Sequence, residues 1–282
     1  MTTDEALAGT PRSQIALSGV PETMLWPLWN RAAETRRNDR LIDDPMAADL
    51  VQRIDYDFQA SFGKPNVLHA VRARVCDNLI RSYIARTPDR PVVVALGEGL
   101  ETQLWRIGDE NLRWLSVDVP EAIEVRRSLL PSDPRALKIE CSALEPTWMD
   151  AVPEGAPPFI SAAGLLMYFQ ETEVRALLER IAKRFPGSEI FFDTIPPFFS
   201  RKTLRGLKVT KRYTAPPMPW GISVVDIPAF VKSLRGLESV TVQDYAEPFP
   251  KRTRLYALLS RIPAVRRKLA GGLVHLRISA EV

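Results

Sequence analysis

The stretch that decides the fold is Val92-Val-Val-Ala-Leu-Gly-Glu-Gly-Leu-Glu-Thr-Gln-Leu-Trp105. It begins with an unbroken apolar run, Val92 to Leu96, which is typical of a strand buried on both faces of a parallel sheet. The segment Gly97-Glu-Gly99 ends this run and leads into a helical pattern. Glycine permits a sharp turn there because it has no Cβ atom. Strand, glycine turn and helix in this order predict one unit of an α/β fold, with a ligand bound at the turn.

The rest of the chain alternates between strand-like and helix-like patterns. The clearest helix runs from Glu171 to Phe185, where apolar residues recur on one face and Pro186-Gly187 ends the segment. Strands that alternate with helices predict a doubly wound α/β sheet that is mostly parallel. Besides Val92–Leu96, the expected strands are Leu112–Val117, Ala136–Cys141, Pro158–Ala162, Glu189–Thr194, Ser239–Gln243 and His275–Ala280.

Two further segments complete the expected domain. The chain up to Thr87 is helical in pattern, with an amphipathic helix at Ala70–Ala85, and we expect it to cover the sheet. The stretch 196–219 is rich in proline and cations and is long for a loop, which predicts a lid over the binding site. We therefore expect a flexible N-terminus at 1–15 and a single domain at 16–282, divided into a helical cover at 16–90, a cofactor-binding core at 91–195, a lid-like insertion at 196–220 and a C-terminal part of the sheet at 221–282.

The composition is that of an ordinary globular protein. Hydrophobic residues make up 45% of the 282 residues, charged residues make up 26%, and the formal net charge is +4. Met1–Gly19 has no cationic start followed by an apolar run, no stretch approaches the ~20 apolar residues of a membrane span, and only two cysteines occur. We expect a cytoplasmic protein with no membrane or nucleic-acid partner, and we interpret its cation clusters as solvated faces: Lys208–Arg212, Lys251–Arg254 and Arg266–Lys268.

An acid at the end of the next expected strand indicates which kind of ligand the turn holds. Asp118 follows Gly97 at about the 20-residue spacing of an acid that accepts the ribose hydroxyls of a nucleotide. A dinucleotide fingerprint would have its third glycine where Thr102 stands, and Glu98 and Glu101 would repel a pyrophosphate. These residues favour a nucleoside cofactor without phosphates that carries a sulfonium cation. A tight turn that binds nothing is the alternative interpretation of the two glycines alone.

More specific motifs stand along most of the chain: Arg31-Ala-Ala-Glu-Thr-Arg36, Leu41-Ile-Asp-Asp-Pro-Met-Ala47, Leu96-Gly-Glu-Gly-Leu-Glu-Thr-Gln103, Val117-Asp-Val-Pro-Glu-Ala-Ile123, and Ala162-Ala-Gly-Leu-Leu-Met-Tyr-Phe169 with Glu173-Val174 after it. Together they resemble the leucine carboxyl methyltransferase-like family, whose bacterial branch includes the polyketide-synthesis O-methyltransferases. The resemblance implies a class I methyltransferase fold with a seven-stranded sheet, an N-terminal helical cover and S-adenosylmethionine as the cofactor.

The resemblance also assigns roles to individual residues. Arg72 would pair with the methionine carboxylate of the cofactor, Asp118 would hold the ribose, and Ala163 would lie beside the methionine portion. Ser142 and Ala143 would flank the adenine. The full set of implied cofactor-binding residues is Arg72, Gly97, Glu98, Gly99, Asp118, Val119, Ser142, Ala143 and Ala163, and the candidate catalytic residue is Tyr168, for which simple packing is the alternative.

Three departures from the family pattern occur within these motifs. Glu101-Thr-Gln103 stands where family members usually have Asp-Thr-Arg, and Ser142 stands where they have an acid near the adenine. Ala163 replaces a glutamate, which removes an electrostatic partner for a cationic cofactor.

The chemistry of methyl transfer narrows the expected acceptor. A sulfonium donor is already activated, so the protein mainly supplies alignment and water exclusion. A carboxylate acceptor, with a pKa near ~4, needs no base, whereas a phenol, near ~10, does. The two histidines, His69 and His275, lie in no catalytic spacing, and we assign both to packing or the surface.

We therefore expect an O-methyltransferase that acts on a carboxylate or phenol of a small, polyketide-like or other secondary metabolite, with a carboxylate favoured. Cations at 201–212 are expected to hold an anionic acceptor. Two alternatives stay open: a repurposed fold that acts as a cyclase or metabolite-binding protein, and a nicotinamide oxidoreductase.

Overall fold

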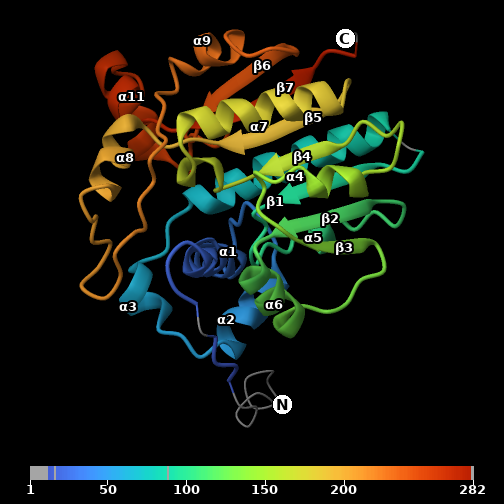
Figure 1. The fold of residues 1–282 in the computed structure, drawn as a ribbon. Helices are drawn as coiled ribbons and strands as arrows, with labels where there is room; N and C mark the ends of the chain where they lie inside the picture. The colour runs from blue at the N-terminus through green and yellow to red at the C-terminus, as the bar shows by residue number, and fades with distance from the viewer. Residues whose placement is uncertain (1–11, 16, 88, 281–282) are drawn as a thin grey trace.

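Seven strands form one sheet, and their bounds are β1 (Val92–Leu96), β2 (Arg113–Asp118), β3 (Ala136–Glu140), β4 (Phe159–Ala162), β5 (Glu189–Asp193), β6 (Leu237–Asp244) and β7 (Gly272–Ile278). In the computed structural model, which describes residues 12–15, 17–87 and 89–280, the strand order is β3-β2-β1-β4-β5-β7-β6 (Figure 1). Strands β1 to β5 are parallel, and β7 runs antiparallel to both β5 and β6. The predicted doubly wound, mostly parallel sheet is confirmed. The strand order reverses between β1 and β4, and ligands of such sheets bind beyond the carboxyl ends of the strands at that point.

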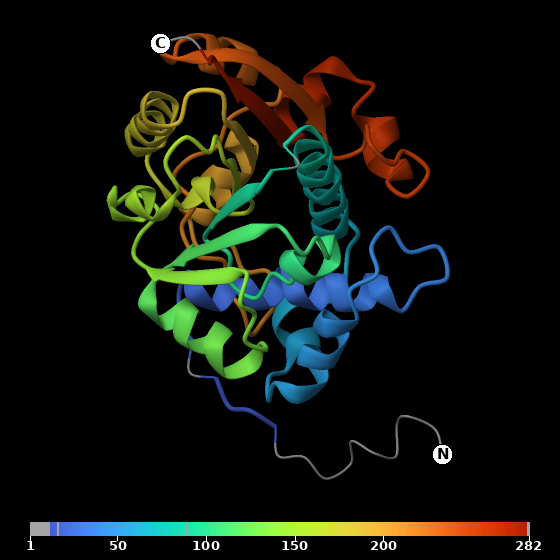
Figure 2. The same ribbon diagram turned by 90° about the vertical axis from the view of Figure 1, so that its right-hand side faces the viewer.

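Helices cover both faces of the sheet. Figure 2 shows α4 (Leu68–Arg86) and α7 (Glu171–Arg184) on opposite faces. The other helices are η1 (Pro21–Met24), α1 (Leu25–Thr35), α2 (Pro45–Arg53), α3 (Phe58–Phe62), α5 (Gln103–Ile107), α6 (Pro120–Leu129), η2 (Thr147–Ala151), η3 (Leu166–Tyr168), α8 (Pro197–Thr203), α9 (Ile227–Lys232), α10 (Arg254–Leu259) and α11 (Pro263–Leu269).

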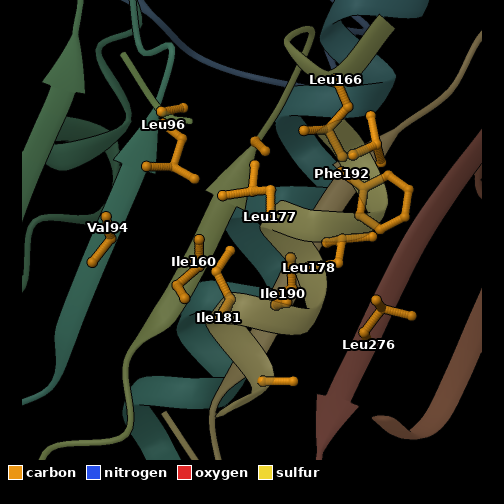
Figure 3. Close-up of a cluster of buried hydrophobic side chains, with 14 of the residues drawn as sticks. Val94, Leu96, Ile160, Leu166, Leu177, Leu178, Ile181, Ile190, Phe192 and Leu276 are labelled. Carbon is orange, nitrogen blue, oxygen red and sulfur yellow. The ribbon is translucent and has the colours of Figure 1, made fainter. Parts of the chain in front are cut away.

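The unbroken apolar run of β1 is explained by burial on both faces. Successive side chains of a strand point to opposite faces, so Val94 and Leu96 pack in the cluster beneath α7, while Val93 and Ala95 pack in the cluster beneath α4. Figure 3 shows Val94 and Leu96 of β1, with Ile160 and Ile190 of the neighbouring strands, in the cluster that also contains the apolar face of α7. Five buried positions in succession are the reason that this strand could be recognised from sequence.

The N-terminal helices α1 to α3 form a separate apolar cluster beside the sheet. Trp26 stacks on Phe62 with ring centroids 5.6 Å apart, and Trp29 stacks on Phe58 at 5.7 Å. Tyr213, from the predicted lid, contacts the same cluster. The predicted flexible N-terminus lies mostly outside the described residues.

The stretch 196–219 was predicted to be one long loop. This prediction is wrong for its first part, which forms the helix α8. It is anchored to the N-terminal cover, since Thr210 Oγ1 donates a hydrogen bond to the Ser61 carbonyl oxygen at 3.1 Å and Arg212 pairs with Asp57 at 3.1 Å.

The last two strands, β6 and β7, are longer than predicted and begin earlier in the chain. Among the described residues, every helix is too short or too polar to cross a membrane.

Candidate functional site

A cavity of about 1070 Å³ lies at the carboxyl ends of β1, β2, β4 and β5. This is the position that the reversal of strand order predicts. All ten of the residues singled out from sequence line its wall: Arg72, Gly97, Glu98, Gly99, Asp118, Val119, Ser142, Ala143, Ala163 and Tyr168. The elements that carry them are α4, the turn after β1, and the segments that follow β2, β3 and β4.

The turn after β1 requires glycine for its backbone. Gly97 and Gly99 have φ values of +62° and +52°, in the left-handed region that residues with a Cβ rarely adopt. A Cβ atom at Gly97 would lie 2.7 Å from Leu165 Cδ1, and one at Gly99 would lie 2.8 Å from Met24 Cβ. The glycines therefore serve both the turn and the close packing of the protein around it.

Asp118 presents a carboxylate to the cavity from the end of β2. Its Oδ2 accepts a hydrogen bond from the Gly99 backbone N–H at 2.8 Å, and its Oδ1 accepts one from the Val119 N–H at 2.8 Å. Burial raises the pKa of this carboxyl, while the two N–H groups act against that shift. Each oxygen can accept a further hydrogen bond, so the carboxylate fits a pair of neighbouring hydroxyls, as in a ribose.

The Glu98 carboxylate does not serve the cavity as a free charge. It accepts hydrogen bonds from Trp114 Nε1 at 3.0 Å, from Ser116 Oγ, and from Arg126 Nη2 at 2.6 Å. Burial raises its pKa to about 7, against the stabilising effect of these three donors. Glu98 thus holds the glycine turn in place.

Glu101 is neutralised as well, through ion pairs with Arg31 at 3.1 Å and Arg106 at 2.5 Å. The expectation that Glu98 and Glu101 would repel a pyrophosphate is therefore wrong, because both carboxylates are paired with arginines. Thr102, which stands where a dinucleotide fingerprint has glycine, is fully buried and donates to the Asp44 carboxylate at 2.7 Å. It joins the turn to the N-terminal cover.

A buried cluster around Asp193 forms another part of the cavity wall. Asp193 Oδ2 accepts hydrogen bonds from Arg72 Nη1 at 3.1 Å and from the Tyr245 hydroxyl at 2.6 Å, and Oδ1 accepts from the Gly164 backbone N–H at 2.5 Å. Burial works against the charge of Arg72, but Asp193 raises its pKa overall. Arg72 lines the cavity as a fixed cation that fits a carboxylate.

Sequence reasoning missed Asp193 and Tyr245. The position of Asp193 at the carboxyl end of β5 was an available indication, since Asp118 occupies the corresponding end of β2. No local pattern marked Tyr245.

His69 also lines the cavity, although it was assigned to packing or the surface. Its Nδ1 lies 2.5 Å from Asn30 Nδ2, and the Asn30 Oδ1 accepts from the Asn66 backbone N–H at 3.2 Å, which assigns the amide nitrogen of Asn30 to His69. His69 Nδ1 is therefore an acceptor and the proton is on Nε2. Burial, then Arg72 and Arg31, hold the pKa of His69 well below its usual value. The imidazole is neutral and can donate from Nε2, but it has no free acceptor nitrogen.

The predicted residues Ser142, Ala143 and Tyr168 lie in two further parts of the wall. Cys141, Ser142 and Ala143 form a small, mainly apolar part of the wall after β3, where Ser142 Oγ accepts from the Leu144 N–H at 3.2 Å and keeps its own proton to donate. Tyr168 lies on the wall, and burial raises its pKa, so its hydroxyl stays protonated at neutral pH.

The segment 196–219, which was predicted to be a lid, contributes apolar side chains to the cavity and not the expected cations. Phe198, Phe199 and Met218 line the wall, whereas the cations at 201–212 are exposed and absent from it. Lys202 lies over the Phe198 ring at 4.6 Å, and Arg212 is paired with Asp57. The prediction that these cations hold an anionic acceptor is wrong, because the helix α8 and the anchored loop turn them away from the cavity.

Comparison of the sequence with known proteins identifies a methyltransferase family and its relatives. Residues 25–182 match the leucine carboxyl methyltransferase family. The tetracenomycin polyketide synthesis O-methyltransferase TcmP of Streptomyces glaucescens is 33% identical over 213 residues, which cover 74% of this chain and 77% of that protein. The S-adenosyl-L-methionine-dependent methyltransferase dpfgK of Gibberella zeae is 28% identical over 64% of this chain and 68% of its own length.

Two solved structures share the fold. A protein from Thermobifida fusca superposes with a TM-score of 0.57 at 16% identity, covering 99% of both chains. A DUF574 family protein from Streptomyces avermitilis gives a TM-score of 0.52 at 13% identity, covering 90% of this chain and 96% of its own.

Proposed function

Because the chain belongs to the leucine carboxyl methyltransferase family, we propose that it transfers a methyl group from S-adenosylmethionine to the carboxylate of a small, largely apolar acid. The protein is an S-adenosylmethionine-dependent methyltransferase, and this assignment excludes the alternative of a nicotinamide oxidoreductase. The acceptor is the part that we propose. An oxygen acceptor agrees with the name of the Streptomyces glaucescens relative.

The donor set of the cavity fits the cofactor. In our assignment Asp118 accepts the ribose hydroxyls, Arg72 pairs with the methionine carboxylate, and the small wall at Ser142 and Ala143 takes the adenine. S-adenosylmethionine supplies an activated methyl group on a sulfonium cation. The protein then has to align the acceptor with that methyl group and keep water away.

The state of three candidate bases on the cavity wall, His69, Asp193 and Tyr168, is the observation that carries the acceptor assignment. His69 is neutral with Nδ1 occupied, Asp193 accepts three hydrogen bonds, and the pKa of the Tyr168 hydroxyl is raised. A phenol needs a base to take its proton, and none of these three groups is free to act as one. A carboxylate is already ionised at neutral pH, so it needs alignment only.

The shape and polarity of the rest of the wall support an apolar body for this acid. Phe198, Phe199, Met218, Tyr256 and Leu269 line the part of the cavity that α8, α10 and α11 border. Aromatic and aliphatic walls of this kind bind flat or aliphatic ligands through burial of apolar surface.

Methyl transfer to matched acceptors tests the acceptor assignment. We expect the protein to methylate aromatic carboxylic acids, such as a naphthoic acid, and to leave the corresponding naphthol unmodified. The product should be an ester that mild alkali hydrolyses to methanol. The rate should be nearly constant between about pH 6 and pH 8, because the acceptor stays ionised, whereas an unassisted phenol would gain about tenfold per pH unit. An alkali-stable methyl ether as the main product, with that rise, would overturn the proposal.

A second prediction concerns Ala163, which lies on the cavity wall next to the Gly164 N–H that Asp193 binds. We expect Ala163→Glu to strengthen S-adenosylmethionine binding by ~3- to 10-fold and to leave S-adenosylhomocysteine binding nearly unchanged, because only the former carries the sulfonium charge. The gross attraction at 4 Å is ~4 kcal/mol at an effective dielectric of ~20, and desolvation removes much of it.

Calorimetric titration of both ligands against Ala163→Glu and the neutral control Ala163→Gln measures this difference. An equal change for both ligands, with a lower melting temperature, would mean that position 163 does not face the sulfonium.

A further inference from the structure

Helices α10 and α11 carry an apolar surface that no other part of the described chain covers. Neither helix has a buried residue. Leu255, Leu258 and Leu259 of α10 recur at the spacing of one helical face, and Ile262 follows just before α11. All four are exposed, Leu255 by 68% and Leu258 by 60%. Apolar residues at this spacing normally face a core, so the stripe indicates a surface that meets something apolar.

The same segment is strongly cationic. Seven lysines and arginines stand between Lys251 and Lys268, and no acid occurs from Pro248 to Ala280. Arg252, Arg266 and Arg267 form ion pairs with acids elsewhere in the chain. The other four, which are Lys251, Arg254, Arg261 and Lys268, are exposed and have no ion pair within the described chain. The partner of this surface is therefore anionic as well as apolar.

The surface adjoins the methyltransferase cavity. Tyr256 and Ser260, on the side of α10 away from the leucine stripe, line the cavity, and so do Leu269 and Ala270 at the end of α11. Tyr256 is also 49% exposed, which places it at the rim. Figure 1 shows α11 beside α8, the lid helix whose Phe198 ring lies 5.5 Å from Lys268 Nζ.

We propose that the α10–α11 surface docks on an anionic lipid bilayer and opens the cavity toward it. A bilayer surface supplies an apolar layer for the leucine stripe and anionic headgroups for the free cations, which is the pattern of helices that lie in the membrane interface. Such docking lets an apolar acceptor move from the lipid into the cavity. It revises the expectation of no membrane contact, since a peripheral surface needs no spanning helix. It does not depend on whether the acceptor is a carboxylate.

Vesicle co-sedimentation of the full chain tests the proposal. We expect binding to vesicles of phosphatidylcholine mixed with phosphatidylglycerol, weak binding to phosphatidylcholine alone, and release at high salt. The double variant Arg254→Glu, Arg261→Glu should bind these vesicles at least ~30-fold more weakly, because this is the loss in affinity expected when two cations are removed from an anionic membrane surface. The double variant Leu258→Ser, Leu259→Ser should lose at least ~10-fold. Because these side chains are exposed, the variants should keep the melting temperature of the wild type.

Matched controls lie elsewhere on the surface. Lys208→Glu with Lys211→Glu makes the same charge change on exposed lid residues, and Leu137→Ser removes a half-exposed leucine of β3, so both should leave vesicle binding unchanged. Equal binding to neutral and anionic vesicles, or no binding to either, would overturn the proposal. If the wild type does not bind vesicles but has the light-scattering mass of a dimer, and the leucine variant has that of a monomer, the surface would instead bind a second copy of the chain. Binding to polyglutamate but not to vesicles would assign it to an acidic protein.

Discussion

Replacing Asp118 by alanine will weaken the binding of S-adenosylmethionine and S-adenosylhomocysteine by ~100-fold or more. The carboxylate stands at the end of β2 on the cavity wall, held by the backbone N–H groups of Gly99 and Val119. The variant loses two hydrogen bonds between a charged group and the ribose hydroxyls, each of which contributes about 1.5–3 kcal/mol. Titration calorimetry measures the loss directly. The rise in melting temperature that S-adenosylhomocysteine gives the wild type should largely disappear.

Asp118→Asn and Asp109→Ala serve as controls for this experiment. Asparagine keeps one acceptor oxygen, so it should bind with intermediate affinity. Asp109 lies after α5 and outside the cavity wall, so its loss should leave the affinity unchanged. If Asp118→Ala binds both ligands as tightly as the wild type, the ribose assignment fails.

Arg126→Met will lower the free energy of unfolding by about 3–5 kcal/mol, the usual cost of leaving one charge of a buried pair without its partner. Arg126 is 1% exposed. It donates to the carbonyl oxygens of Gly99 at 2.8 Å and Glu101 at 2.7 Å and to the Glu98 carboxylate at 2.6 Å. Its loss leaves Glu98 buried without its cation and removes the donors that hold the glycine turn. Denaturant unfolding measures the change.

The neighbouring residue supplies a matched control. Arg127 pairs with Glu140 on the surface, where both side chains are largely exposed, so Arg127→Met should cost less than ~1 kcal/mol. Adding Glu98→Gln to Arg126→Met should recover part of the lost stability, because a buried glutamine needs neither a cation nor a bound proton to be neutral. Equal losses for Arg126→Met and Arg127→Met would show that the buried pair does not hold the turn.

The cluster around Asp193 offers a physical reason why the chain tolerates alanine at position 163. Asp193 binds the N–H of Gly164, the residue directly after Ala163, and it also pairs with Arg72. A carboxylate thus stands beside this segment even though position 163 lacks one. A second carboxylate from Ala163→Glu would share Arg72 with Asp193, and this competition limits the gain that we expect from that variant.

Several features followed from the sequence alone because each depends on residues close together in the chain. The strand at Val92–Leu96 was recognisable from five consecutive buried positions, and the turn from two glycines that both need a left-handed backbone. Asp118 was predictable because parallel strands end at one edge of the sheet, where their polar residues meet. The same rule explains why the nine candidate residues at or after the carboxyl ends of β1 to β4 line one cavity.

Only the tertiary structure decided which atoms each charged group meets. Glu98 was expected at the cofactor, but its carboxylate lies against Arg126 of α6 and Trp114 of β2. Arg72 and Asp193 are far apart in the chain and meet only because the N-terminal part of α4 packs near the carboxyl end of β5. Likewise, the packing of the segment 196–219 against the N-terminal helices turns its cations outward. The pattern of a sequence reports burial and periodicity, whereas the partner of a buried charge is set by contacts between distant elements, and these define the chemistry of the cavity.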